Sequence, residues 1–232
     1  MILLLETSTL NCSIALATPD GRCVARCDES SEKHQHAERL HLLIDQLLHK
    51  NNVQRDALTA LAIGKGPGSF TGLRIGTSAA KGICAGLSIP LIAPSPLRAL
   101  QHLGQTLHPE FLAQPHRVVP AIAARRMELY TLDHKGKVAA SVVDAAFRQD
   151  LQDGPALLIG DGAEKCTDIL SSHPAHWIIE QRFPTAADLI PETLTLIERG
   201  ECEPVGDFEP FYLKDFVPGQ PKDPLGLRNP SS

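Results

Sequence analysis

The chain has 232 residues, a mass of 25.1 kDa and 43% hydrophobic residues, enough for one large domain or two small ones with hydrophobic cores. Its formal net charge of −5 disfavours a protein that grips nucleic acid by itself, because phosphate binding needs clustered lysine and arginine. The six cysteines are dispersed without a C-x-x-C pair, so neither a zinc ribbon nor a disulfide framework is indicated. The apolar run at residues 2–5 is far shorter than that of a signal peptide, and we expect a cytoplasmic protein.

The first half of the chain predicts a three-stranded meander followed by alternating helices and strands. Apolar segments at residues 2–5, 12–17 and 22–27 are the expected strands of the meander. The elements expected after it are a helix at 36–50, a strand at 58–63, a helix at 71–86, a strand at 90–93 and a helix at 95–107.

A glycine-rich loop lies between the strand at 58–63 and the helix that follows it. Its glycines and Pro67 suit a turn with positive φ angles, and Ser69 or Thr71 can cap the helix. Because a helix N-terminus attracts anions, the loop is a candidate anion or nucleotide-adjacent site, although it matches neither the Walker A nor the dinucleotide pattern. A tight structural turn is the alternative. The candidate residues are Lys65, Gly66, Gly68, Ser69, Thr71 and Arg74.

Two helices of the first half offer surfaces for association. One carries a leucine stripe, and the other carries small residues at helical spacing, whose glycines each cost about 0.5–1 kcal/mol relative to alanine. Close packing against another helix or a sheet is the usual compensation. We expect the two helices to form a partner interface, and a bulky residue at Gly76 or Ala80 to block association without unfolding the chain. The expected interface residues are Leu40, Leu43, Leu47, Gly72, Leu73, Gly76, Ala79, Ala80 and Ile83.

The second half repeats the order of the first, with a meander and then alternating helices and strands. Strands are expected at 118–123, 128–132, 138–143, 156–160 and 177–180, with helices at 161–171 and 185–199. We therefore predict a duplicated α/β fold with an N-terminal lobe at residues 1–108 and a C-terminal lobe at 117–216. The proline-rich tail at 217–232 is expected to be disordered.

Several motifs together resemble the TsaB (YeaZ) family. They are Glu6-Thr7-Ser8-Thr9, the loop from Gly66 to Gly76, Pro120-Ala121-Ile122 before Arg125, Ile159-Gly160-Asp161-Gly162 and Glu209-Pro210-Phe211-Tyr212-Leu213. The resemblance implies an actin-like ATPase fold, of the ASKHA and ribonuclease H-like group, with mixed sheets flanked by helices. It also implies a role in threonylcarbamoyladenosine (t6A) modification of adenosine 37 in tRNAs that read ANN codons.

The resemblance further implies a non-catalytic protein that forms a heterodimer with its paralogue TsaD, recruits the ATPase TsaE, and forms a homodimer when alone. It implies contact with tRNA only through the complex, no tightly bound cofactor, and ATP or ADP at the complex interface. Two departures remove an aspartate that the family usually carries, since Glu6 and Ala123 stand at those positions. The loss of these two aspartates weakens the hypothesis that the protein is an active enzyme.

Catalytic alternatives remain open at this point. An active nucleotide-binding phosphotransferase or a glycoprotease-like metallohydrolase is the main one. A set of His34, Glu38 and His41 on one helical face can bind zinc, but no ligand from a second element is visible, and a solvated polar face explains it better. We therefore expect no metal site and no catalytic residues.

Overall fold

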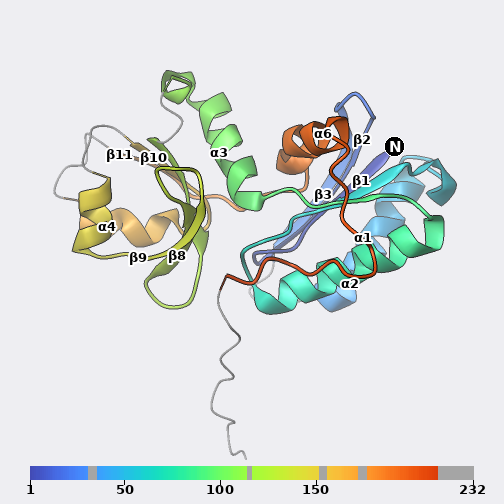
Figure 1. The fold of residues 1–232 in the computed structure, drawn as a ribbon, viewed down its shortest axis with the longest axis horizontal. Helices are drawn as coiled ribbons and strands as arrows, with labels where there is room; N and C mark the ends of the chain where they lie inside the picture. Colours follow the sequence, from blue (N-terminus) through green and yellow to red (C-terminus); the bar gives the residue numbers. More distant parts are fainter. Residues whose placement is uncertain (31–35, 114–116, 152–155, 172–176, 214–232) are drawn as a thin grey trace, which may run out of the picture.

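The computed structural model describes residues 1–30, 36–113, 117–151, 156–171 and 177–213. They form two lobes, and helix α3 (Pro96–Leu107) runs from the first lobe onto the second (Figure 1). The tail at 217–232, expected to be disordered, lies outside the described residues. None of the helices in the described ranges is long and apolar enough to cross a membrane.

The first lobe is built on a five-stranded sheet with the order β3-β2-β1-β4-β5. The strands are β1 (Ile2–Glu6), β2 (Asn11–Ala17), β3 (Cys23–Ser30), β4 (Ala60–Ile63) and β5 (Leu91–Ile92). The first three pair antiparallel, which confirms the predicted meander, and β4 pairs parallel with both β1 and β5.

Helices cover both faces of this sheet. Leu3 and Leu5 of β1 belong to a core shared with α1 (His36–Lys50) and α2 (Phe70–Leu87). Ile2 and Leu4 point to the opposite face, where they pack near α6 (Ile190–Glu198). Figure 1 shows α1 and α2 on one side of the sheet and α6 on the other. Because both faces are buried, β1 reads as a continuous apolar run rather than an alternating one.

The second lobe holds two three-stranded sheets, with the orders β11-β10-β6 and β7-β8-β9. The strands are β6 (Val118–Pro120), β7 (Ile122–Ala123), β8 (Glu128–Leu132), β9 (Val138–Val142), β10 (Ala156–Ile159) and β11 (Trp177–Glu180), and the short helices are α4 (Ala145–Asp150) and α5 (Thr167–Leu170). Strands lie in all the predicted ranges, but the single strand predicted at 118–123 is divided into β6 and β7, which belong to different sheets. The helix expected at 161–171 is a 3-10 turn at Ala163–Cys166 followed by α5. The predicted α/β architecture with mixed sheets is confirmed.

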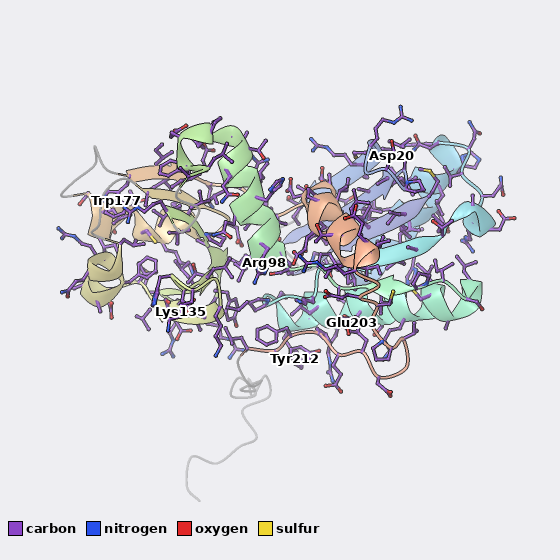
Figure 2. The ribbon with its side chains drawn as sticks, turned by 45° about the horizontal axis from the view of Figure 1, so that its top comes forward. Asp20, Arg98, Lys135, Trp177, Glu203 and Tyr212 are labelled. Atoms are coloured by element: carbon purple, nitrogen blue, oxygen red, sulfur yellow. The ribbon has the colours of Figure 1, made fainter. Side chains whose placement is uncertain are left out.

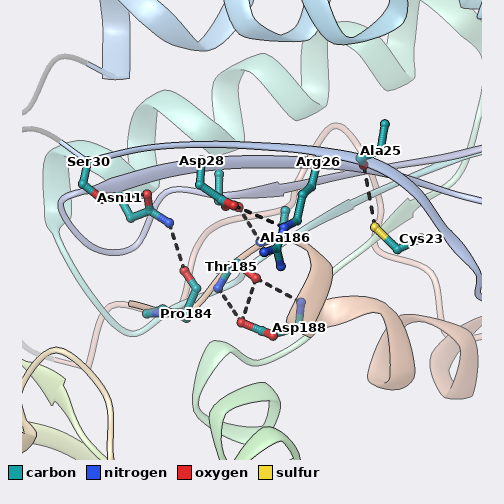
Figure 3. A network of polar contacts seen from close by, with 11 residues as sticks. Asn11, Cys23, Ala25, Arg26, Asp28, Ser30, Pro184, Thr185, Ala186 and Asp188 are labelled. Atoms are coloured by element: carbon teal, nitrogen blue, oxygen red, sulfur yellow. Dashed lines mark hydrogen bonds and ion pairs between the residues drawn. The ribbon is translucent and has the colours of Figure 1, made fainter. Parts of the chain in front are cut away.

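The chain returns to the first lobe after β11, contrary to the expected division at residue 216. Ala186 and Ile190 pack into the core on the α6 side of the first sheet. The Ala186 N–H donates to Ser13 Oγ at 2.7 Å, and the Asn11 side-chain amide donates to the Pro184 carbonyl at 3.5 Å (Figure 3). The reason is that the apolar face around Ile2 and Leu4 needs a cover, which α6 supplies.

Residues 203–213 form an extended strap that leads from α6 along the first lobe to the space between the lobes (Figure 1). The Glu203 N–H donates to the Leu91 carbonyl at 2.8 Å, which places the strap against the edge strand β5. Lys81 Nζ on α2 donates to the carbonyls of Gly206 and Phe208. The strap is therefore hydrogen-bonded both to the sheet and to α2.

Candidate functional site

A groove of about 710 Å³ lies between α1 and α2 on the outside of the first lobe. Its lining is mostly apolar, and α1 contributes His41, Ile44 and Leu48 while α2 contributes Ile75, Ser78, Gly82, Ile83 and Gly86. The exposed pair Asp45 and Arg55 lies at its rim and forms an ion pair. An apolar groove between two helices can accept a helix of another protein.

Most of the residues expected at the partner interface do not face this groove. Leu40, Leu43, Leu47, Leu73 and Ala80 are at most 6% exposed and belong to the interior of the first lobe. Only two of the nine expected residues, Ala79 and Ile83, line the groove. The expectation that the leucine stripe faces a partner is therefore wrong, because that stripe covers the sheet of its own chain.

The glycine row Gly72 and Gly76 also faces inward. A Cβ on Gly72 would collide with the Thr7 carbonyl, and a Cβ on Gly76 would collide with the Thr7 hydroxyl. These glycines let α2 approach the end of β1, so their helical cost is offset inside the chain rather than by a partner. The structure contradicts the expectation that a bulky residue at Gly76 or Ala80 leaves the fold intact, because Ala80 is also fully buried.

A second glycine row, Gly82 and Gly86, faces outward. Both are exposed and line the groove, and a Cβ at either position would meet no atom within 4 Å. This row costs helix stability and makes no compensating contact among the described residues. It is the row that a partner helix can approach closely.

The glycine-rich loop is part of a different cavity, a cleft of about 500 Å³ between the two lobes. The predicted cap is confirmed, since Ser69 Oγ accepts from the Gly72 N–H at 3.2 Å. A Cβ on Gly68 would collide with the Ser8 carbonyl, which accepts from the Ser69 N–H at 2.7 Å. The loop therefore packs closely on the turn after β1.

The six candidate anion-site residues lie in separate places in the structure. Gly68, Ser69 and Thr71 line the cleft. Arg74 lines the groove, and Lys65 lies beside the strap. Gly66 has a φ of +94°, as expected for a turn glycine, and is buried against Leu73 and the Phe211 carbonyl. The structure thus does not bring the six residues together around one position.

Glu6, the last residue of β1, is fully buried. Its Oε1 accepts from the Ser8 N–H at 2.6 Å, and its Oε2 makes no hydrogen bond to any described residue. Gly64 leaves room for this carboxyl group, because a Cβ there would collide with Oε2. Burial raises the pKa of Glu6 to about 7 against the lowering effect of Ser8, and Asp188 and Asp161 raise it further.

Asp161 approaches the cleft from the second lobe. Its Oδ1 accepts from the Ala123 N–H at 3.1 Å, and burial raises its pKa to about 6. Next to it, Lys165 Nζ donates to the carbonyls of Ala124, Arg126 and Glu128 at 2.7–3.0 Å. These bonds hold the loop between β7 and β8, in which Arg126 has a left-handed backbone with a φ of +54°.

The side chains considered for a metal do not form a site in the described ranges. No three His, Cys, Asp or Glu residues there lie close enough to hold an ion, and His34 lies outside those ranges. His41 is exposed and lines the groove, and Glu38 is exposed on the same helix. Sequence reasoning did not single out Phe70, Tyr130 and Tyr212, which line the cleft. Tyr212 belongs to the motif from Glu209 to Leu213, but nothing in that motif indicates that its ring lies near α2.

Comparisons with known proteins find proteins of tRNA threonylcarbamoyladenosine (t6A) biosynthesis. The family model for tRNA N6-adenosine threonylcarbamoyltransferase (TsaD) matches residues 29–169, which include both groove helices. The chain is 36% identical over 129 residues to TsaB of Haemophilus influenzae, which is 56% of this chain and 51% of that protein. It is 27% identical over 235 residues to TsaB of Escherichia coli, covering 93% of this chain and 95% of that protein.

A solved structure extends the likeness to the fold. YeaZ from Pseudomonas aeruginosa is 28% identical and superimposes with a TM-score of 0.69 over 91% of this chain and 99% of that one. The match covers both lobes, so the predicted α/β fold is confirmed, and it is the fold of that YeaZ protein. By these sequence and structural matches, the chain belongs to the TsaB (YeaZ) family of t6A biosynthesis proteins, and it is also related in sequence to TsaD.

Proposed function

We propose that this protein is a non-catalytic partner of a TsaD-type transferase in the t6A modification of adenosine 37 in tRNAs that read ANN codons. It acts in the cytoplasm, binds TsaD through the groove between α1 and α2, and recruits TsaE to the complex. The observation that carries the proposal is the outward glycine row, Gly82 and Gly86, on the floor of an apolar groove.

The similarity to TsaD supports this choice of partner. The matched residues 29–169 contain α1 and α2, so a TsaD-type protein is expected to carry a similar pair of helices. Two such pairs can pack as a four-helix arrangement around a shared apolar core. The same surface can pair with a second copy of this chain when TsaD is absent.

The position of the Glu6 side chain and the presence of alanine at position 123 support a non-catalytic role. The Glu6 carboxyl is directed at Gly64 inside the lobe, and Glu6 is not among the described residues that line the cleft. Ala123 contributes a backbone N–H rather than a carboxylate. We therefore propose no tightly bound cofactor in the isolated chain, and place ATP or ADP at the contact with TsaD.

Reconstitution tests the proposal. TsaD, TsaE, tRNA and threonylcarbamoyl-adenylate are combined with and without this protein, and t6A is measured by mass spectrometry of nucleosides. The proposal predicts modification only when the protein is present. Equal modification without it contradicts a role as partner, and turnover of ATP or cleavage of a peptide by the protein alone supports an enzyme of the phosphotransferase or glycoprotease-like class instead.

A further inference from the structure

The five-stranded sheet has one covered edge and one uncovered edge among the described residues. At the covered edge, the Glu203 N–H of the strap donates to the Leu91 carbonyl of β5 at 2.8 Å. At the other edge, the eight-residue strand β3 pairs only with β2 within the described ranges. In Figure 2, Asp20 in the turn between β2 and β3 lies on the opposite side of the first lobe from Glu203. An unpaired edge strand offers backbone N–H and C=O groups to another strand.

The outer edge of β3 is suited to such pairing. Its residues pair one to one with β2 from Ala25 to Ser30, and the bulge near Val24 lies at the other end of the strand. The strand contains no proline, so each of its residues keeps a backbone N–H. Strand side chains stand out of the plane of the sheet, so the charged residues of β3 leave this edge accessible. They disfavour only those strands that place like charges opposite them.

Two opposite charges stand two residues apart on β3. Arg26 Nε lies 3.7 Å from Asp28 Oδ2, and the two side chains are 61% and 31% exposed (Figure 3). Ser13 Oγ donates to Asp28 Oδ1 at 2.5 Å and accepts from the Ala186 N–H, which fixes this carboxylate on the α6 face of the sheet. Because side chains alternate along a strand, Arg26 shares that face, whereas Cys27 packs against the core on the α1 face.

A second copy of the chain matches these charges in one register. Two antiparallel β3 strands related by a two-fold axis perpendicular to the sheet can be centred on any one residue. Centring on Cys27 places Arg26 of each copy opposite Asp28 of the other, with their Cβ atoms about 4.5–5.5 Å apart. Centring on Arg26 or on Asp28 places like charges opposite each other. Centring on Ala25 leaves Arg26 opposite an apolar residue.

We infer that two copies of this chain pair through the outer edges of their β3 strands, centred on Cys27, and so form one continuous sheet. The partner is a second copy because the sequence of charges is complementary to itself in this register. No residue of β3 lines the groove between α1 and α2. The inference therefore does not depend on docking of TsaD in that groove.

Sedimentation velocity tests the pairing in full chains that carry Gly82→Arg, a substitution chosen to block contact through the groove. We expect a monomer–dimer equilibrium that depends on protein concentration. Arg26→Asp and Asp28→Arg should each raise the dissociation constant about tenfold or more, because like charges then face each other in both cross-strand pairs. An equimolar mixture of the two variants should dimerise again, because the acidic positions of one face the basic positions of the other.

The matched control is Lys135→Asp, which makes the same change of charge at an exposed position of the second lobe (Figure 2). It should leave the dissociation constant unchanged. The thermal midpoint by circular dichroism checks that each variant is folded, and Arg26→Asp should pass because its side chain is mostly exposed. If Asp28→Arg unfolds, Arg26→Asp and cross-linking decide the outcome.

Cysteine cross-linking tests the register. Cys23 and Cys202 are exposed and Cys27 is partly exposed, whereas the other three cysteines are buried. In a chain with Cys23→Ser and Cys202→Ser, a short bis-maleimide should join Cys27 of the two copies, and Arg26→Asp should suppress this product.

Four results would each overturn the inference. They are a monomer at every concentration, an unchanged dissociation constant in folded Arg26→Asp, failure of the folded variants to pair in the mixture, and absence of the cross-link in a chain whose Cys27 reacts with N-ethylmaleimide.

Discussion

Arg74 and Phe70 stand one helical turn apart on α2, and the Arg74 guanidinium lies 4.7 Å from the centroid of the Phe70 ring. Arg74 lines the groove proposed for TsaD, whereas Phe70 lines the cleft. One residue pair therefore touches both cavities. A partner that rearranges Arg74 changes the surroundings of the Phe70 ring, which gives the two sites a direct physical connection.

Arg74→Leu is predicted to weaken TsaD binding several-fold, because it removes a groove residue whose guanidinium is held on the Phe70 ring by a cation–π contact of about 0.5–1 kcal/mol. Isothermal calorimetry with TsaD measures the effect, and the thermal midpoint checks that the variant remains folded. Ser78→Arg, which places a bulky charged side chain in the lining of the same groove, should also weaken TsaD binding. Unchanged TsaD affinity in both variants would show that this part of the groove does not contact the partner.

Gly76→Leu is predicted to destabilise the fold by about 2–3 kcal/mol or more, because the side chain would have to displace Thr7 and Ile63 from the packed contact between α2 and β1. Urea unfolding followed by circular dichroism measures this change. Gly82→Ala should instead stabilise the chain by about 0.5–1 kcal/mol, since its Cβ meets open space in the same helix. Similar free energies of unfolding for the two variants would contradict the assignment of the inward and outward faces.

The two glycine rows also show what the sequence could and could not predict. The spacing of small residues correctly indicated close packing of α2, but it cannot tell a sheet of the same chain from a helix of another. The inward row faces its own chain because it packs on Thr7. Thr7 is distant in sequence from α2 and is brought to it by the pairing of β1 with β4. The interface residues were therefore assigned mostly to the wrong face.

Local patterns predicted most elements, because apolar runs and helical periodicity show which residues within a single helix or strand are buried. The end of the second lobe could not be found in this way. The helix near α6 was expected, yet its packing against Ile2 and Leu4 follows from a chain reversal that no local pattern encodes. Likewise, the replacement of aspartate by Glu6 was visible in the sequence, but the direction of its side chain toward Gly64 was not.

Glu6 makes stability depend on pH. Its pKa is raised from 4.5 to about 7 by burial, so the folded state binds this proton more tightly than the unfolded state. The resulting stabilisation is complete below about pH 4.5 and is lost as the pH rises through about 7, with a total of about 3 kcal/mol. Asp161, whose pKa is raised to about 6, acts in the same direction.

Glu6→Gln should remove the larger part of this dependence, because glutamine keeps the shape and does not titrate. Urea unfolding of both proteins at about pH 5 and about pH 8 measures it. We expect the wild type to lose more stability than the variant between these values. A wild-type protein that becomes more stable over this range, relative to the variant, would mean that Glu6 is ionised and stabilised in the fold.

Lys165→Met is predicted to loosen the loop between β7 and β8, because it leaves the carbonyls of Ala124, Arg126 and Glu128 without their common donor. Hydrogen exchange should increase in residues 124–128, which include the cleft residue Arg125. TsaD binding should not change, because the groove lies on the other lobe. Unaltered exchange in the loop would show that other contacts hold it.

Partner docking in the groove is tested most directly by the affinity for TsaD of Gly82→Arg, compared with Ala85→Arg. Both positions are exposed on α2, but Gly82 lines the groove and Ala85 does not. Because arginine is a better helix former than glycine, Gly82→Arg should remain folded, and its thermal midpoint serves as the check. We predict that calorimetry finds TsaD binding lost in Gly82→Arg and kept in Ala85→Arg, whereas wild-type affinity in folded Gly82→Arg would contradict docking in this groove.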